Sequence, residues 1–281
     1  MSIPVSALAG SDPVAAAIRA EALGFDFVSA SDHPEGTTAS FEVWTMLCFI
    51  AAATSRIKVA TRVLGAPYRS PAVVAKMAES LSRLSGGRLI LGLGAGSADD
   101  EHRAFGLGVR TAKEKTDGLE EAVTVIRGLW TQTDFTFDGR VYQTDVANLE
   151  PKPVHPIPIW LGTFAPRALA VTGRLADGWI PSHGYMPDDE LPKMRQRVLT
   201  AARRAGRDPA EIRCVYNIAV HLGGDLPEEP DVLSETADKL VERLLGYQDI
   251  GFSGFNFSLV GPNTFEQAEQ IARDVIPALR S

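Results

Sequence analysis

The sequence predicts a closed α/β barrel of eight strand–helix units, the (β/α)8 TIM-barrel fold, with insertions. The chain has 281 residues, a length that such barrels reach as one domain, and 45% of its residues are hydrophobic. Short apolar runs rich in β-branched residues alternate with segments of helical period along the chain. Eight parallel strands favour a barrel, because an open sheet would leave its edges unpaired. We therefore expect a single domain over residues 1–281.

Strands are expected where apolar runs end at small or polar residues. In chain order they are residues 3–8, 25–31, 57–63, 88–94, 157–162, 178–182, 213–222 and 254–261. Helices are expected at residues 13–23, 42–54, 71–84, 112–130, 166–174, 189–205, 233–248 and 264–279. Residues 132–156 break the alternation, because two alternating runs flank Asp138-Gly139, a hairpin signal. We interpret this segment as a hairpin insertion between the fourth and fifth strands.

The composition argues against several classes of partner. The net charge is −7, from 35 acidic and 28 basic residues, so the chain has no global attraction for nucleic acid or an anionic membrane. No apolar run approaches the roughly 18 residues of a membrane helix, and no basic signal-peptide region precedes Arg19. Cys48 and Cys214 show neither redox nor metal-ligand spacing. We therefore expect a cytoplasmic protein that acts on a small molecule and holds no metal.

Functional groups of such barrels lie on the loops that follow the strands. Asp32 and His33 follow the second expected strand, where a carboxylate and an imidazole can bind or protonate a ligand. The alternative for this pair is a surface loop with a helix-capping Asp. After the third strand, Gly65 and Pro67 follow an uninterrupted apolar run, and either a bulge or an ordinary loop fits that pattern.

The stretch "LGLGAGSADDEHRAFG", residues 91–106, follows the fourth strand and resembles a dinucleotide-binding turn at first sight. The spacing fails in both registers, because the position for the third glycine is Ser97 when counted from Gly92 and Asp99 when counted from Gly94. A Walker-type Gly-Lys-Ser/Thr is absent as well. What remains is a strand end with little side-chain bulk, which suits a flat ring lying close to the backbone.

The fifth strand is followed by a candidate anion site. Gly162 and Thr163 precede a helix that begins near Pro166, and the free N–H groups of a helix N-terminus bind phosphate well. The Thr163 hydroxyl can add a hydrogen bond, and Arg167 either assists or lies on the surface. We therefore interpret this turn as a phosphate site.

The remaining histidines have weaker signals. His102 is expected to be solvated on its helix, and His155 is expected to be structural. His183 and His221 follow strand ends, so their roles stay open between the site and the scaffold. No histidine pair shows metal-ligand spacing, and no G-x-S-x-G supports a hydrolase nucleophile.

Three segments together resemble the luciferase-like monooxygenase family over nearly the whole chain. They are "SDHP", "ATRVLGAPYRSPAVVAKMAESLSRLSGGRLILGLGAGSADDEHRAFG" and "PKPVHPIPIWLGTFAPRALAVTGRLADGWIPS". The family fold is an eight-stranded barrel with insertions, and its members use FMN or the deazaflavin coenzyme F420. Asp-His after the second strand, with "GLGAG" lacking a following arginine, resembles the F420 branch, whereas FMN members more often show Glu-His-His and Gly-Arg-Gly. The resemblance implies an F420-dependent oxidoreductase that transfers hydride between the deazaflavin and a small organic substrate.

The resemblance also implies roles for particular residues. It places a non-prolyl cis peptide in Arg62 to Leu64, at the Arg62-Val63 bond, with that backbone supporting the ring. His33 is the expected proton donor and the one expected catalytic residue, and Gly94 to Ser97 line the other side of the ring. The expected cofactor-binding residues are Asp32, His33, Arg62, Val63, Leu64, Gly65, Gly94, Ala95, Gly96, Ser97, Gly162, Thr163, Phe164 and Ala165.

The chain departs from two members of that branch. The sugar-phosphate dehydrogenases have a glutamic acid where this chain has Ser97 and a lysine near Tyr185, so we do not expect that activity. Methanopterin reductases also carry acidic groups around this site, which argues against their activity. Relatives would differ in the loops around residues 183–187 and 225–230, so the substrate and the direction of reaction stay unassigned.

Two alternative functions remain, an FMN-dependent monooxygenase supplied by a reductase and a barrel that binds a ligand without chemistry. The family resemblance further implies a homodimer.

Overall fold

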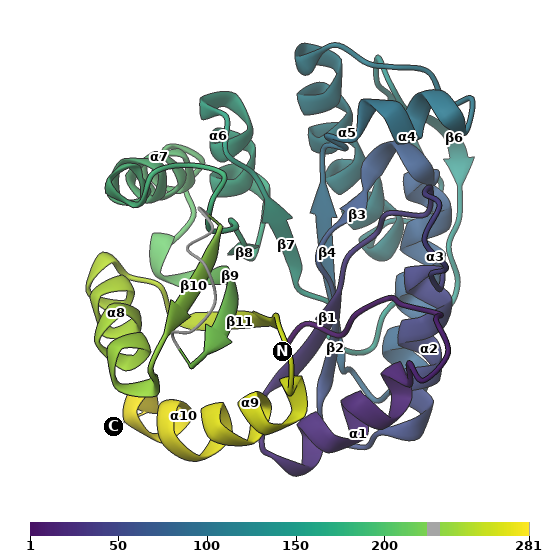
Figure 1. Cartoon of the computed structure of the whole chain (residues 1–281). Helices are drawn as coiled ribbons and strands as arrows, with labels where there is room; N and C mark the ends of the chain where they lie inside the picture. The colour runs from purple at the N-terminus through teal and green to yellow at the C-terminus, as the bar shows by residue number, and fades with distance from the viewer. Residues whose placement is uncertain (224–230, 281) are drawn as a thin grey trace.

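The computed structural model describes residues 1–223 and 231–280, and a curled, mostly parallel sheet surrounded by helices forms its centre (Figure 1). The strands are β1 (Phe27–Ala30), β2 (Lys58–Thr61), β3 (Leu64–Gly65), β4 (Leu89–Gly94), β5 (Phe135–Asp138), β6 (Gln143–Ala147), β7 (Ile159–Gly162), β8 (Gly178–Trp179), β9 (Arg213–Leu222), β10 (Val232–Glu235) and β11 (Gly254–Leu259). The helices are α1 (Pro13–Ala22), α2 (Val43–Ala53), α3 (Pro71–Leu84), α4 (Asp99–Ala104), α5 (Ala112–Thr131), α6 (Pro166–Leu175), α7 (Leu191–Arg204), α8 (Ala237–Ile250), α9 (Thr264–Gln270) and α10 (Ile276–Arg280). A π-helical turn, Ile271–Val275, joins α9 to α10.

The sheet closes into a barrel through residues 1–3. Its parallel order runs β1, β2, β4, β7, β8, β9, with β11 pairing β9. The Ser2 N–H donates to the Phe257 carbonyl of β11 at 2.7 Å, and the Ile3 N–H donates to the Ser29 carbonyl of β1 at 2.7 Å. These bonds connect the last strand to β1, so the predicted barrel fold is confirmed.

Two predicted elements are wrong. The first expected strand, residues 3–8, leaves the barrel after Ile3, because residues 5–7 exchange backbone hydrogen bonds with residues 39–41 instead. The helix expected from residue 233 begins at Ala237, because β10 pairs in parallel with the end of β9. The loop expected at residues 225–230 lies outside the described residues.

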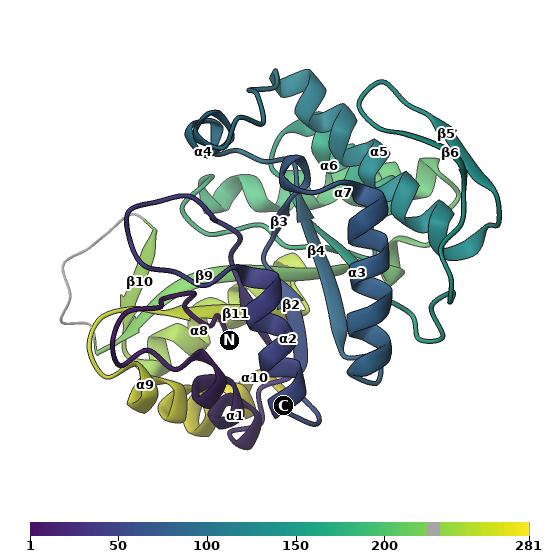
Figure 2. The same cartoon turned by 90° about the vertical axis from the view of Figure 1, so that its right-hand side faces the viewer.

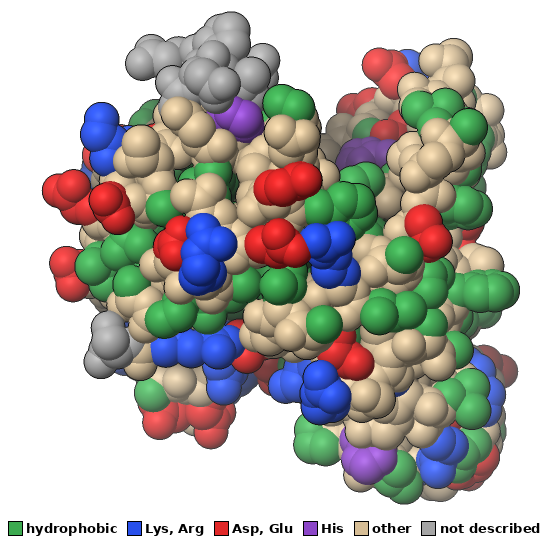
Figure 3. Space-filling view, turned by 60° about the horizontal axis from the view of Figure 1, so that its bottom comes forward, with side chains coloured by type: hydrophobic (Ala, Val, Ile, Leu, Met, Phe, Trp, Pro, Cys, Tyr) green, Lys and Arg blue, Asp and Glu red, His purple; other side chains and the backbone are tan. Residues whose placement is uncertain are grey.

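An antiparallel hairpin, β5 and β6, lies within the expected insertion at residues 132–156. Together with α4 and α5 it lies at the top of the molecule in Figure 2, whereas α1, α9 and α10 lie at the bottom. The face turned to the viewer in Figure 3 mixes acidic, basic and hydrophobic side chains. Among residues 1–223 and 231–280, no helix has both the length and the apolar character needed to span a bilayer.

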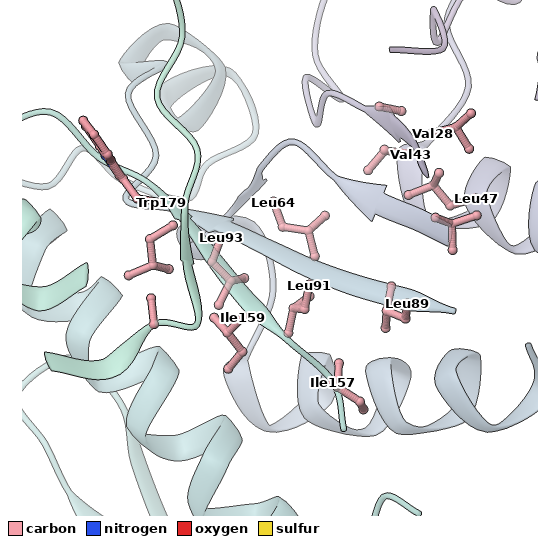
Figure 4. Packing of buried hydrophobic residues seen from close by; sticks show 14 of the residues in the cluster. Val28, Val43, Leu47, Leu64, Leu89, Leu91, Leu93, Ile157, Ile159 and Trp179 are labelled. Atoms are coloured by element: carbon pink, nitrogen blue, oxygen red, sulfur yellow. The ribbon is translucent and has the colours of Figure 1, made fainter. Parts of the chain in front are cut away.

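The strands of the barrel pack differently on their two faces, because successive side chains of a strand point in opposite directions. Leu89, Leu91 and Leu93 of β4 share one face and join the main hydrophobic core with Leu64 and Ile159 (Figure 4). The other face of the strands contributes a second cluster of buried residues, which fills the barrel: Ala60, Ile90, Trp160, Ile180 and Val215, with Phe27 and Val63 packed against it. This cluster closes the barrel below the loops that follow the strands.

Candidate active site

A cavity of about 450 Å³ lies at the carboxyl ends of the barrel strands, and we call it the mouth cavity. Its lining includes nearly all of the expected site residues: Asp32, His33, Arg62, Val63, Gly65, Gly94, Ala95, Gly96, Ser97, Gly162, Thr163, Phe164 and Ala165. Leu64 is not part of the lining, because its side chain is buried in the core outside the barrel. The fold therefore brings together residues from four separate segments at the ends of the strands.

The third-strand segment forms a bulge beside β4. The Arg62–Val63 peptide bond is cis, as the resemblance implied, and Leu64–Gly65 then pairs with Leu93–Gly94. The Val63 side chain lies against the glycines of the neighbouring strands, because a Cβ atom added to Gly94 would be 2.6 Å from Val63 Cγ2, and one added to Gly162 would be 3.3 Å away. Position 94 therefore has to be glycine because a side chain there would collide with Val63. The sequence interpretation had attributed the absence of a side chain at this position to a bound ring.

Asp32 holds this bulge in place. Its buried carboxylate accepts two hydrogen bonds from Arg69, at 2.7 and 3.1 Å, and a third from the Gly65 N–H at 3.1 Å. Arg69 also donates to Glu42 at 2.6 Å, at the start of α2. Asp32 lines the mouth cavity, but both of its oxygens already have partners within the protein.

His33 is held by a carboxylate that sequence reasoning missed. The His33 side chain is 59% exposed, and its Nδ1 lies 2.7 Å from Glu101 Oε1 on α4. Tyr68 OH donates to the other Glu101 oxygen at 2.5 Å. Burial and the Glu101 carboxylate raise the pKa of Tyr68, so its hydroxyl stays protonated as a donor. Glu101 thus accepts from Nδ1–H and leaves Nε2 of His33 for a ligand.

The expectation that His102 is solvated is wrong. The residue is 1% exposed, and its ring packs edge-on against Tyr68 with 4.9 Å between the ring centroids. Burial lowers the pKa of the imidazole, which favours its neutral form. Gly96, with a φ of +79°, lets the chain pass over His102, because a Cβ there would lie 2.8 Å from the His102 ring. His102 therefore packs against Tyr68, whose hydroxyl donates to Glu101, the carboxylate that holds His33.

The expected phosphate site has one cation that the sequence interpretation missed. Lys115 of α5 lines the same cavity as Gly162 to Ala165, and its Nζ lies 2.5 Å from Asp99 Oδ1. The Thr163 hydroxyl pairs with the Thr172 hydroxyl at 2.7 Å, so it already has a partner in α6. Arg167 forms an ion pair with Asp117 and does not line the cavity. The candidate donors for an anion here are the N-terminal end of α6 and Lys115.

The rim beyond this site is aromatic and braced by a polar cluster. Phe164 stacks on Tyr185 with ring centroids 4.9 Å apart, and both rings line the cavity. His183 is not part of the lining, and its Nδ1 contacts Asp188 at 3.2 Å. Burial opposes the ionisation of Asp188, but hydrogen bonds from His183 and Tyr247 outweigh burial and lower its carboxyl pKa to about 2. This cluster anchors the loop that carries Tyr185.

His221 lies away from the mouth cavity as well. It is buried, and its Nδ1 lies 3.2 Å from the Val260 carbonyl oxygen and 3.4 Å from Gln267 Nε2. Both of the histidines left open by the sequence, His183 and His221, therefore contact the scaffold and do not line the cavity.

Residues 9–249 match the sequence model of a family described as luciferase-like monooxygenase. The chain belongs to the luciferase-like monooxygenase family. This match confirms the resemblance to that family, which the sequence interpretation based on the glycine-rich stretch and two other segments. Within the family fold, the mouth cavity occupies the end of the barrel where functional loops gather.

Named relatives of this luciferase-like protein include two dehydrogenases. The F420-dependent glucose-6-phosphate dehydrogenase of Kineococcus radiotolerans is 30% identical, with 94% of this chain and 91% of the relative aligned. The F420-dependent hydroxymycolic acid dehydrogenase of Mycobacterium tuberculosis is 35% identical over 71% of this chain and 56% of the relative. A solved F420-dependent secondary alcohol dehydrogenase, in complex with an F420–acetone adduct, shares the fold with a TM-score of 0.90 at 22% identity, covering 100% of this chain and 98% of its own.

Proposed function

We propose that this protein is a coenzyme F420-dependent oxidoreductase that transfers a hydride between the deazaflavin and a small organic substrate. The observation that carries this proposal is that one cavity holds the His33 imidazole, which a carboxylate fixes, together with the N-terminal end of α6 and the ammonium group of Lys115. The first arrangement suits the proton that accompanies hydride transfer to a carbonyl group, and the second suits a phosphate. The names of the two dehydrogenase relatives support F420 as the cofactor.

The residues of the mouth cavity fit such a cofactor. The cavity volume of about 450 Å³ lies within the usual range for cofactor sites. Small residues, Gly94 to Ser97, and the bulge at Val63 would flank the ring system. The N-terminal end of α6 and Lys115 would hold the phosphate, since they place backbone N–H groups and an ammonium group at one end of the cavity.

When bound, the deazaflavin supplies hydride chemistry that amino-acid side chains lack. The protein supplies placement and a proton. Reduction of a carbonyl group needs a proton at the new hydroxyl oxygen, and oxidation of an alcohol removes it. His33 Nε2 can serve both directions, because the imidazolium donates there and the neutral ring accepts there. Glu101 acts as a positioning residue, because it holds Nδ1–H and thereby fixes the tautomer and orientation of His33.

Cofactor titration tests this function. F420, reduced F420 and FMN are added separately while the fluorescence of the tryptophans is followed, and turnover is then screened with enones, imines, quinones and secondary alcohols. We expect saturable binding of F420 and turnover with at least one substrate class. Tight binding of FMN without binding of F420 would overturn the proposal. Binding of F420 without turnover across the screen would favour a ligand-binding role.

Variants of the imidazole and its carboxylate test the mechanism. We expect His33→Ala to lower kcat by on the order of 10²-fold, the usual effect of a general acid. Glu101→Gln should change the pH profile of kcat/KM while the Kd for F420 stays within twofold, because the cofactor contacts remain. Glu242→Gln, on exposed α8, is the matched control. Unchanged turnover in His33→Ala removes the role of His33, and an unchanged pH profile in Glu101→Gln removes the role of Glu101.

We also propose a homodimer through the surface of α2 and α3. A groove of about 620 Å³ lies between these helices, lined mostly by apolar and small residues that include Trp44, Ala52 and Met77. Phe49 and Leu84 project from the same helices with 67% and 87% of their surface exposed. Hydrophobic side chains gather on the right-hand side in Figure 3, the side on which Figure 1 shows these helices. Projecting side chains beside a groove suit a two-fold interface, in which each copy supplies both.

A further inference from the structure

The inside of the barrel has a polar layer above its hydrophobic plug. The plug includes Phe27, Ala60, Ile90, Trp160, Ile180 and Val215. The inward position two residues further along each of these strands holds Ser29, Arg62, Gly92, Gly162, Ser182 and Asn217, because strand side chains repeat with a period of two. None of these six residues is acidic. The layer therefore carries one formal charge, the Arg62 guanidinium.

Arg62 has no ionic partner among the described residues. Its Nη2 donates to Ser2 Oγ at 3.1 Å, whereas its Nε is shielded from solvent and makes no hydrogen bond. Asp32, which lines the same cavity, is paired with Arg69 instead. Burial lowers the pKa of the Arg62 guanidinium, but arginine keeps its charge in proteins. A cation held away from water without a counter-charge is costly unless a ligand supplies one.

Ser182 offers a second donor on the same cavity wall. The Ser29 hydroxyl donates to Asn256 Oδ1 at 2.9 Å, so Asn256 Nδ2 is directed to Asn217 Oδ1 at 2.6 Å. Asn217 Nδ2 in turn donates to Ser182 Oγ at 2.9 Å. Because Ser182 Oγ accepts this bond, its own hydrogen remains to be donated. Ser182 and Arg62 both line the mouth cavity, so two donor groups and no acidic group in this layer face the ligand.

From this arrangement we infer that Arg62 and Ser182 bind an anionic oxygen of the substrate, and that the substrate is a small organic acid whose carboxylate lies on the polar layer. The planar guanidinium binds carboxylates with two parallel hydrogen bonds, which an amide or ketone of the same size does not match. The inference rests on the proposed function in calling this ligand a substrate. It adds the chemical class that the sequence left unassigned.

The test compares butyrate with butyramide, an acid and its neutral amide, by ligand-observed NMR on protein without cofactor. We expect the wild type to bind butyrate roughly tenfold more tightly, the size of a charge-assisted hydrogen bond. Arg62→Met should abolish this preference, Arg62→Lys should keep part of it, and Ser182→Ala should reduce it about threefold. Arg273→Met, at an exposed pair with Asp274, is the matched control and should change nothing. Equal binding of acid and amide by the wild type, or an intact preference in Arg62→Met, overturns the inference.

Circular dichroism first establishes that each variant is folded, and Arg62→Lys and Ser182→Ala decide the question if Arg62→Met fails to fold. Titration with F420 separates the source of the anionic oxygen. A Kd for oxidised and reduced F420 within twofold of wild type in Arg62→Met supports the substrate as the source. Weaker F420 binding with an unchanged acid preference assigns the contact to the cofactor and overturns the inference. Failure of the wild type to bind F420 overturns the proposed function and leaves the acid–amide comparison standing.

Discussion

Gly94→Ala should destabilise the protein without any cofactor present, because the new side chain collides with Val63 in the bulge that follows β2. The new Cβ would lie 2.6 Å from Val63 Cγ2, so a branched side chain held by the barrel interior must move. Overpacking of this kind costs typically 1–3 kcal/mol, and we expect about 2 kcal/mol. For a chain of 281 residues that corresponds to a fall in Tm of about 3–4 °C. Thermal and urea unfolding without cofactor measure the effect.

Two further variants make this prediction specific. In a Val63→Ala background, Gly94→Ala should cost at least about 1 kcal/mol less, because the atom that it strikes has been removed. Gly246→Ala is the matched control, since Gly246 lies in α8 with no neighbouring atom within 4 Å of the new Cβ, and it should stabilise by about 0.5–1 kcal/mol. If Gly94→Ala is as stable as the wild type, or lowers the free energy of unfolding equally in both backgrounds, then contact with Val63 is not the reason for glycine at position 94.

Three other predictions concern the scaffold of the site and the proposed interface. The lowered pKa of the Asp188 carboxyl contributes stability that is present above about pH 4 and is lost as the pH falls towards 2. Because the side chain is 35% exposed, this contribution is about 1 kcal/mol. Urea unfolding of Asp188→Asn should lack this dependence on acid. Arg69→Met leaves the Asp32 carboxylate buried without its cation and should lower the free energy of unfolding in urea by about 3 kcal/mol. The double variant with Asp32→Asn should recover most of this loss, and additive losses from the two single variants would contradict the pairing. Phe49→Glu should convert the dimer to a monomer in light scattering at micromolar concentration while its circular dichroism spectrum stays that of a folded chain, and a monomeric wild type would contradict the proposed interface.

The sequence predicted the barrel because its strongest signal, apolar runs alternating with helical segments, is local. It failed at residues 3–8, where the run leaves the barrel after Ile3 and its residues 5–7 pair with residues 39–41 instead. It failed again at residues 232–235, whose apolar character suits a helix or a strand equally and whose pairing with β9 decides the outcome. Local patterns predict which segments are apolar, whereas long-range pairing decides where each one hydrogen bonds.

The same limit explains the candidate site. Residues at or just after strand ends, such as His33 and Thr163, were found because barrel geometry makes them neighbours. Glu101 was missed because it lies 68 residues from His33 and on a helix, where an acidic side chain is ordinary. His102 was expected in water because the six-residue α4 is too short to show a buried face by periodicity. The Arg62–Val63 cis bond came from the family resemblance and from no property of the residues themselves.

The two-layered interior also separates what this barrel can change from what it must keep. The plug around Trp160 stops any ligand from reaching deeper than the polar layer, so a larger substrate must extend outward, past the stacked rings of Phe164 and Tyr185. Selection among substrates of one chemical class therefore falls to the rim, while the groups at the bottom recognise a feature that all of them share. Redesign for longer substrates should begin at Tyr185 and leave Arg62 and Ser182 unchanged.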